Sequence, residues 1–234
     1  MSEVNLEPSD YYGWQGYRLS CGDLEAGIVP NIGGRVISLR YRGEELLFYQ
    51  QEHAGETFQF DGTEDLRQRK QELGFRLWGG DKTWVAPQSE WWEDIPPLEL
   101  DAAAYASGLE DNAVFMLSPI CRETGLRVSR RVELTGPDTL RLTEEFRNPS
   151  DRPIKRGIWN VTQMLRPSGV AVEVRLPAER EMIRSYPEEG RSVELRDEAV
   201  RVAEEDTLVV CDGPDRKFKY GGHLREGPIR TLRP

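Results

Sequence analysis

Apolar and polar residues alternate over many short stretches of this chain, which is the pattern of β-strands with one buried face. The clearest alternating stretches are residues 35–41, 126–134, 140–146 and 170–176. In the first of them, Ile37, Leu39 and Tyr41 are expected to share one face of a strand. The pattern predicts an all-β fold.

Turn signals separate these stretches at close intervals. Glycine, proline, asparagine and aspartate gather at residues 31–34, 42–43, 135–138 and 148–151. Connections this short join antiparallel neighbours, so consecutive strands are expected to form hairpins. Because large β-sandwiches commonly reach about 200 to 250 residues, we predict a single antiparallel sandwich domain over residues 1–234.

One helix is predicted, over residues 63–73. Asp61 together with Glu64 is the expected N-terminal cap, and Gly74 is the expected stop. The apolar stripe of this segment is thin, so a charged surface helix and an irregular loop both fit the sequence. No function is assigned to it.

The overall charge restricts the partners of the protein. The chain has 41 acidic and 31 basic residues, a formal net charge of −10. Such a charge repels nucleic acid and anionic lipid headgroups, so neither is expected as a partner, and a neutral ligand fits better. No stretch is apolar over the length that spans a bilayer, and residues 1–15 lack the basic start and apolar run of a secretion signal. We therefore expect a cytoplasmic protein.

The three cysteines, Cys21, Cys121 and Cys211, lie far apart in the sequence, and none belongs to a CxxC pair. An odd number at such spacing indicates neither a disulfide framework nor a zinc site. We expect buried, reduced thiols that act as small apolar residues rather than a catalytic thiol. No metal site is predicted.

The tryptophan-rich segment, residues 77–97, has neither a strand nor a helix period. It contains four of the six tryptophans of the chain, which are Trp78, Trp84, Trp91 and Trp92. Asp81, Lys82 and Gln88 alternate with them and supply hydrogen-bonding groups. Recognition of a pyranose ring requires flat apolar surfaces beside such groups. The segment is predicted to bind a sugar, and the alternative is a small satellite core beneath a long ordered loop.

Three stretches carry a resemblance to a known family. They are residues 17–48, residues 78–88 with the sequence WGGDKTWVAPQ, and residues 131–164 with the turn Asn148-Pro149-Ser150-Asp151. In this order they resemble a galactose mutarotase-like domain, and the resemblance extends from about Tyr17 to Lys219. It implies an antiparallel β-supersandwich of the galactose mutarotase-like type, whose concave face binds a small-molecule sugar or glycan. It also implies that no metal or organic cofactor is used.

The resemblance says what catalysis would require. In active members a carboxylate base takes the proton of the anomeric hydroxyl, and a histidine protonates the ring oxygen. Where active members have an Asn-His pair on a central strand, this chain has Asn160 followed by Val161. The two histidines, His53 and His223, are expected to be solvated surface residues. The histidine acid is therefore not expected here.

The family's glutamate base belongs to a late strand, and this sequence ends at Pro234. We expect the last strands to be replaced by an irregular tail over residues 220–234. An exposed sheet edge would follow, and because unpaired edges favour pairing with another chain, a homodimer is expected.

The residue types and the resemblance together give a set of candidate ligand-binding residues. They are Arg35, Asp81, Lys82, Trp84, Gln88, Trp159, Asn160 and Gln163. Trp84 is the first choice for stacking on a sugar. Trp159 and Gln163 share one face of a strand and Asn160 takes the other, so not all candidates are expected to line one groove.

Several of these residues have a structural alternative. For Arg35 the alternative of a surface arginine is favoured, and Asp81 with Lys82 is equally explained as a salt-bridged turn. Asp81 is also the one candidate for a catalytic base. Glu144 and Glu145 are neighbours on a strand, so only one of them faces inward, and this disfavours a paired-acid glycosidase site.

Three functional hypotheses follow. The first is a carbohydrate-binding protein without standard epimerase catalysis, since the histidine acid is missing. The second is an aldose mutarotase or epimerase in which Asp81 or a nearby carboxylate is the base. The third is an interaction module that uses the tryptophan-rich segment as a subunit contact. The sequence leaves open whether the protein is an enzyme.

Overall fold

The computed structural model describes residues 3–165 in full. Beyond them it describes the strand backbones of residues 169–173, 184–185, 200–202, 208–212, 220–221 and 229–232. By their contacts the residues group into two compact units, residues 1–165 and 166–234, where one domain over the whole chain was expected.

The first unit contains a large antiparallel sheet. Its strands follow the order β1-β2-β3-β4-β6-β11, and β5 pairs with β4. They are β1 (Asn5–Tyr11), β2 (Trp14–Cys21), β3 (Leu24–Val29), β4 (Arg35–Tyr41), β5 (Glu44–Glu45), β6 (Asp81–Ala86) and β11 (Gly157–Thr162). The first four strands form successive hairpins, and the predicted turn at residues 31–34 lies between β3 and β4.

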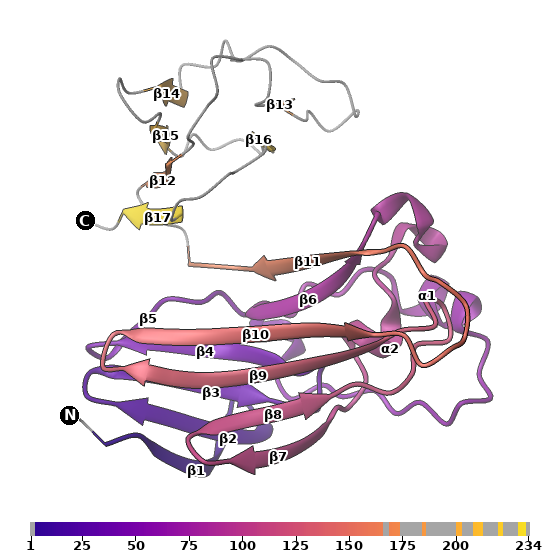
Figure 1. The fold of residues 1–234 in the computed structure, drawn as a ribbon, viewed down its shortest axis with the longest axis horizontal. Coiled ribbons are helices and arrows are strands. Elements are labelled where there is room, and N and C mark those ends of the chain that lie inside the picture. Colours follow the sequence, from indigo (N-terminus) through magenta and orange to yellow (C-terminus); the bar gives the residue numbers. More distant parts are fainter. Residues whose placement is uncertain are drawn as a thin grey trace. The chain divides into compact units, whose positions relative to one another are not determined.

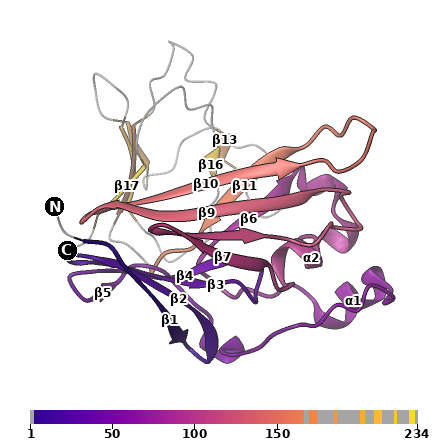
Figure 2. The same ribbon diagram turned by 60° about the horizontal axis from the view of Figure 1, so that its bottom comes forward.

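A second antiparallel sheet lies face to face with the first (Figure 1, Figure 2). It has the order β10-β9-β8-β7. Its strands are β7 (Ala106–Glu110), β8 (Ala113–Leu117), β9 (Arg127–Gly136) and β10 (Thr139–Arg147). The all-β, antiparallel prediction is confirmed, and this unit is a β-sandwich.

The main core fills the space between the two sheets. The large sheet contributes Leu19, Ala26 and Ile28, and the second sheet contributes Met116 and Val128, all with exposed fractions of 0%. Each of the larger side chains stabilises the fold by about 1.5–3 kcal/mol relative to exposure to water, and the methyl group of Ala26 by less. In β9 and β10 the apolar residues alternate with polar ones, because only the face that points to the main core packs against apolar side chains.

A second apolar cluster lies apart from the main core. It comprises Tyr11, Trp14, Val29, Ile32, Ile37, Trp78 and Ala102. In the pairing of β3 with β4, Ile28 is opposite Val36 and Gly27 is opposite Ser38, so Ile37 is an extra residue in β4. This bulge separates Ile37 from Leu39, which packs on the main core. The prediction that the two share a face was therefore wrong.

The turn before β4 brings a distant helix to the sheet. Gly33 has φ +74°, and a Cβ there would lie 2.4 Å from the carbonyl oxygen of Asp101. Its N–H donates to the carbonyl of Ala103 at 2.9 Å. Glycine is needed at this position because both the backbone angle and the close approach exclude a side chain. The turn thereby docks α2 (Leu98–Asp101) beside the start of β4.

Helix α1 (Leu66–Leu73) begins later than the sequence predicted. Its N-cap is Asp65, which accepts hydrogen bonds from the N–H groups of Arg67 and Gln68. Asp61 instead accepts from the N–H of Thr63 at 2.8 Å, in a local turn. The expected stop at Gly74 is confirmed. Three short 3-10 helices complete this unit: η1 (Gln51–His53), η2 (Gln88–Glu90) and η3 (Trp92–Asp94).

The second unit has two small antiparallel sheets. One has the order β14-β15-β12-β17, and the other pairs β13 with β16. The strands are β12 (Gly169–Glu173), β13 (Arg184–Ser185), β14 (Val200–Val202), β15 (Leu208–Asp212), β16 (Tyr220–Gly221) and β17 (Ile229–Leu232). Residues 220–234, expected as an irregular tail, thus contain strand β17, which pairs with β12. Of the alternating stretch 170–176, residues 174–176 lie outside the described residues. None of the helices within the described residues has the length and apolarity needed to cross a membrane.

Candidate functional site

Strand β6 directs its side chains to two opposite faces of the large sheet. Asp81 and Thr83 point into the sandwich, where Arg130 of β9 meets Asp81. Lys82 and Trp84 point to the other face. Trp159 of β11 is paired with Trp84 and therefore shares that other face. The candidate residues thus separate into two groups.

The inward group is a polar network that joins the two sheets. The Arg130 guanidinium donates to the Asp81 carboxylate and lies 3.0 Å from the Glu144 carboxylate. The Asn160 amide donates to Asp81 at 3.2 Å and to Glu144 at 2.9 Å, and the Thr162 hydroxyl donates to Asp81 at 2.6 Å. Both carboxylate oxygens of Asp81 are therefore occupied by donors, and we assign Asp81 a structural role.

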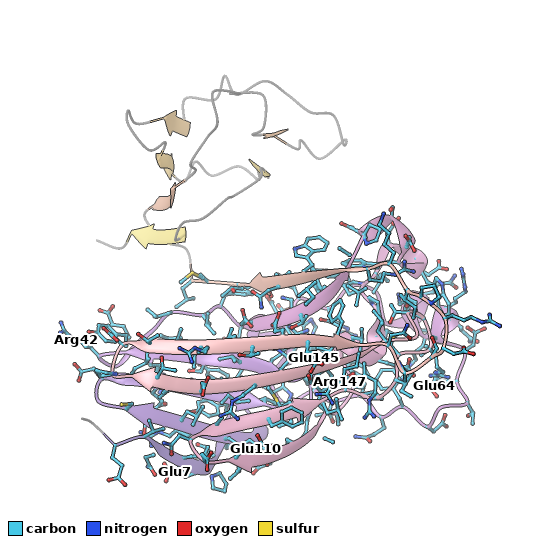
Figure 3. All side chains as sticks on the ribbon, in the orientation of Figure 1. Glu7, Arg42, Glu64, Glu110, Glu145 and Arg147 are labelled. Atoms are coloured by element: carbon cyan, nitrogen blue, oxygen red, sulfur yellow. The ribbon has the colours of Figure 1, made fainter. Side chains whose placement is uncertain are left out.

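The expected arrangement of the two neighbouring glutamates on β10 is confirmed. Glu144 faces inward to Arg130, whereas Glu145 is exposed on the outer face. Glu145 and Arg147 lie near each other on β10 in Figure 3, and their charged groups are 2.8 Å apart. An exposed pair of this kind contributes at most about 1 kcal/mol.

Arg35 is fully buried and does not face a groove. Its guanidinium donates to the carbonyl of Gly79 at 2.9 Å and to the carboxylate of Asp101 at 2.6 Å. The Cζ atom of Arg35 also lies over the Trp78 ring, 5.4 Å from the ring centroid. Burial lowers the pKa of Arg35, and the negative charge of Asp101 partly offsets this. Arg35 links β4, the chain before β6 and helix α2.

Asp101 is the residue of this region that the sequence did not single out. One of its carboxylate oxygens accepts both from Arg35 and from the indole N–H of Trp84, the latter at 2.8 Å. It lies 66 residues from Arg35 in the sequence. The sequence feature most closely related to Asp101 is the pair Gly33-Gly34. Because Gly33 has no side chain, the end of α2 can lie against this turn.

The outward group is the lysine–tryptophan cluster, defined as Lys82, Trp84, Trp91, Trp159 and Gln163. Lys82 is 3% exposed, its amine donates to the side-chain oxygen of Gln163, and it lies 4.9 Å above the Trp84 ring. Burial, followed by the positive charge of Arg35, lowers the pKa of Lys82 to about 7, although Asp101 and Asp81 act in the opposite direction.

The aromatic rings of the cluster differ in accessibility. Trp84 is 9% exposed, because three aromatic rings surround it in edge-to-face contacts. The centroids of the Phe75, Trp91 and Trp159 rings lie 6.2, 5.3 and 5.4 Å from the centroid of the Trp84 ring. Trp91 stacks on Trp159 at 5.6 Å and donates its indole N–H to the carbonyl of Val85 at 2.6 Å. Trp159 is only half-buried. It is therefore a better surface for stacking than Trp84, the first choice from the sequence.

The other candidates in the tryptophan-rich segment lie elsewhere. Trp78 is buried in the second apolar cluster, which fits the satellite-core alternative. Trp92 is half-buried, with Arg67 lying 4.6 Å over its ring. Gln88 is exposed on η2 and does not join the lysine–tryptophan cluster.

The described cysteine and histidine side chains lie outside the lysine–tryptophan cluster. Cys21 and Cys121 are buried, as expected, and burial raises the pKa of the Cys121 thiol. His53 is half-buried on η1, 3.2 Å from the Glu56 carboxylate. His223 and the side chain of Cys211 lie outside the described residues. In the described part of the chain, no cluster of histidine, cysteine and acidic side chains is arranged to hold a metal ion.

A surface cavity of about 650 Å³ lies beside α1, away from the lysine–tryptophan cluster. Its lining includes the four carboxylates of Asp61, Glu64, Asp65 and Glu72, and the ring of Phe60. Gln59, Gln68 and Arg69 also line it, so the cavity has both donors and acceptors, but Phe60 is its one aromatic ring. It therefore offers less flat apolar surface for a pyranose than Trp84 and the three aromatic rings around it do. We therefore place the candidate site at the cluster on β6 and β11.

Comparison with known proteins gives a family but no activity. Residues 15–219 match a family model described as "Domain of unknown function (DUF4380)". The crystal structure of the Slr1438 protein from Synechocystis sp. PCC 6803 is similar, with a TM-score of 0.49 and 12% sequence identity. That likeness covers 98% of this chain and 96% of the other. None of the curated proteins matches the sequence.

Proposed function

The chain belongs to the DUF4380 family of domains of unknown function, and from its site we propose that it binds carbohydrate. The ligand is a small-molecule sugar or glycan held against the lysine–tryptophan cluster. The galactose mutarotase-like type of sandwich and a cytoplasmic location are parts of the same proposal. The observation that carries it is the half-buried ring of Trp159 beside the polar side chains of Lys82 and Gln163 on one face of the sheet.

The cluster offers the two kinds of surface that a pyranose needs. Trp159 is held by stacking on Trp91 at 5.6 Å, with an interplanar angle of 22°, so its ring is fixed before a ligand arrives. A fixed ring supports CH groups of a sugar at little entropic cost. The half-buried Gln163 supplies an amide N–H and an oxygen, and the amine of Lys82 supplies further donors.

Binding is favoured over standard epimerase catalysis. The base of the second hypothesis, Asp81, already accepts hydrogen bonds from Arg130, Asn160 and Thr162. Among residues 3–165 the one histidine is His53, on η1, and it is not part of the cluster. The usual carboxylate and histidine pair therefore has no counterpart in the described site.

The test is a thermal-shift panel of mono- and oligosaccharides at millimolar concentration. A sugar that binds only the folded protein stabilises it by about 1.4 kcal/mol when its concentration is ten times the Kd, and so raises the midpoint. We expect one class of sugar to do so for the wild type and not for Trp159→Ala.

The matched control is Trp92→Ala, which removes another half-buried tryptophan, on η3 and outside the lysine–tryptophan cluster. It is expected to keep the sugar-induced shift. The proposal is contradicted if no sugar of the panel raises the wild-type midpoint. A Trp159→Ala variant that loses dimerisation instead of sugar binding would support the subunit-contact hypothesis.

A further inference from the structure

Two buried lysines of the first unit have opposite surroundings. The amine of Lys70 on α1 lies 2.7 Å from the Glu123 carboxylate and donates to the carbonyls of Trp92 and Ile95 at 3.0 and 2.6 Å. Burial lowers the pKa of Lys70 as well, but the Glu123 carboxylate acts in the opposite direction and, together with the two carbonyl oxygens, gives the charged amine direct partners. Lys70 is therefore a structural anchor that ties α1 to the tryptophan-rich segment.

Lys82 has no comparable partners. Its amine donates to a neutral amide oxygen, that of Gln163, and lies over the Trp84 ring. It forms no ion pair with a carboxylate of residues 3–165. The nearby carboxylate of Asp101 is already shared by Arg35 and the Trp84 indole. The surroundings therefore favour the neutral amine, which has a free electron pair.

The approach to this amine lies through residues that are only half-buried. Gln163 and Trp159 are both half-buried, whereas Lys82 and Trp84 beneath them are 3% and 9% exposed. One hydrogen bond joins the Lys82 amine to the side-chain oxygen of Gln163. This hydrogen bond has to break when an aldehyde reaches the amine.

We propose that Lys82 is a reactive amine that condenses with aldehydes, and that its natural partner is the open-chain aldehyde form of an aldose. Lysines act in this way when they are desolvated in an apolar pocket or lie near another cation. Both conditions hold here, through Trp84 and Arg35. A pKa of Lys82 near 7 agrees with this role.

The reaction requires no cofactor. The amine's electron pair forms a bond to the carbonyl carbon, and the π pair moves to the oxygen, which gains a proton while the nitrogen loses one. The resulting carbinolamine loses its hydroxyl together with the second nitrogen proton as water. Amine and aldehyde thus give an imine and one water molecule.

The inference deepens the proposed function and rests on it for the identity of the aldose. The reactivity of the amine rests only on its surroundings. It can therefore be measured with a small probe, glycolaldehyde, which requires no specific binding site.

The experiment is reductive trapping followed by peptide mapping. The full-length protein is incubated near neutral pH with glycolaldehyde and sodium cyanoborohydride, which reduces an imine to a stable amine, and mass spectrometry measures labelling of each lysine. With a pKa near 7, Lys82 is half neutral at pH 7. An ordinary lysine is neutral to only about 0.03% there, and although an amine of lower pKa is intrinsically less nucleophilic, we expect Lys82 to be labelled at least about tenfold faster than the exposed Lys155.

Controls within the same molecule make the result decisive. Lys70 is expected to remain unlabelled, and in concentrated urea the labelling rates of Lys82 and Lys155 are expected to become equal. A Lys82→Arg variant is expected to lose the fast label and keep the others. The inference is overturned if Lys82 in the folded protein is labelled no faster than Lys155.

The outcome separates the inference from the proposed function. Fast labelling of Lys82 without any sugar-induced thermal shift would keep the reactive amine and reject carbohydrate binding. A sugar-induced shift with slow labelling would keep carbohydrate binding and reject the reactive amine.

Discussion

Replacement of Lys82 by methionine tests the energetic cost of burying this amine. Methionine is similar in length and carries no charge, so Lys82→Met removes the buried ammonium and keeps most of the packing around Trp84. The pKa of Lys82 is lowered from 10.5 to about 7 in the folded protein. Between these values the unfolded chain binds more protons than the folded chain, so this lysine makes stability rise with pH. Below pH 7 both states are protonated and the cost is constant.

The magnitude follows from the same two pKa values. A difference of 3.5 pKa units, from 10.5 to 7, corresponds to a cost of about 5 kcal/mol for the charged form. Most of this cost is relieved between pH 7 and pH 10, so the stability of the wild type relative to Lys82→Met is expected to rise by about 3 kcal/mol over that range. The loss of the Gln163 hydrogen bond, about 1 kcal/mol, shifts the difference equally at each pH.

The assay is urea unfolding of both proteins at a series of pH values across this range. Tryptophan fluorescence reports the transition, and the free energy of unfolding is obtained by linear extrapolation. The control is Lys155→Met, at an exposed position, which is expected to leave the pH dependence of the wild type unchanged. A stability difference between wild type and Lys82→Met that stays flat across this range would refute the reasoning.

Two further predictions concern the support of the site. Asp101→Asn keeps the shape of the side chain but leaves the buried Arg35 without its carboxylate, so we expect a loss of about 3–5 kcal/mol in urea unfolding; a loss below about 1 kcal/mol would count against this role. Gly33→Ala places a Cβ 2.4 Å from the Asp101 carbonyl oxygen, whereas Gly43, at φ +81°, has open space. Both substitutions strain the backbone by about 1 kcal/mol or more, and Gly33→Ala is expected to lower the unfolding midpoint further than Gly43→Ala; equal effects would contradict the docking of α2 described above.

The alternating strands were the most predictable part of the fold. Strands β9 and β10 bury one face and expose the other, so their period of two is visible in the sequence. Strand β6 was missed because residues Asp81 to Val85 are all buried, which removes the alternation. The bulge at Ile37 was also invisible, since an extra residue in β4 is defined only by its pairing with β3.

The candidate site was predictable in its residue types and less so in its geometry. The tryptophan-rich segment and residues 157–163 were recognised, and the structure pairs Trp84 with Trp159 across β6 and β11. No sequence pattern indicated that Asp101 bridges Arg35 and Trp84, because the contact with Arg35 joins segments far apart in the chain. It also did not show that Lys82 lacks a carboxylate partner among residues 3–165, which depends on what surrounds its amine in three dimensions.

The most direct test of carbohydrate binding at the lysine–tryptophan cluster is NMR of the tryptophan indole N–H groups during a sugar titration. The chain has six tryptophans, of which Trp84, Trp91 and Trp159 lie in the cluster, while Trp14 and Trp78 are buried in the second apolar cluster. The account predicts that a binding sugar shifts the Trp159 signal most, shifts the signals of Trp84 and Trp91 less, and leaves those of Trp14 and Trp78 in place. It is contradicted if a sugar that binds the protein leaves the Trp159 signal unchanged.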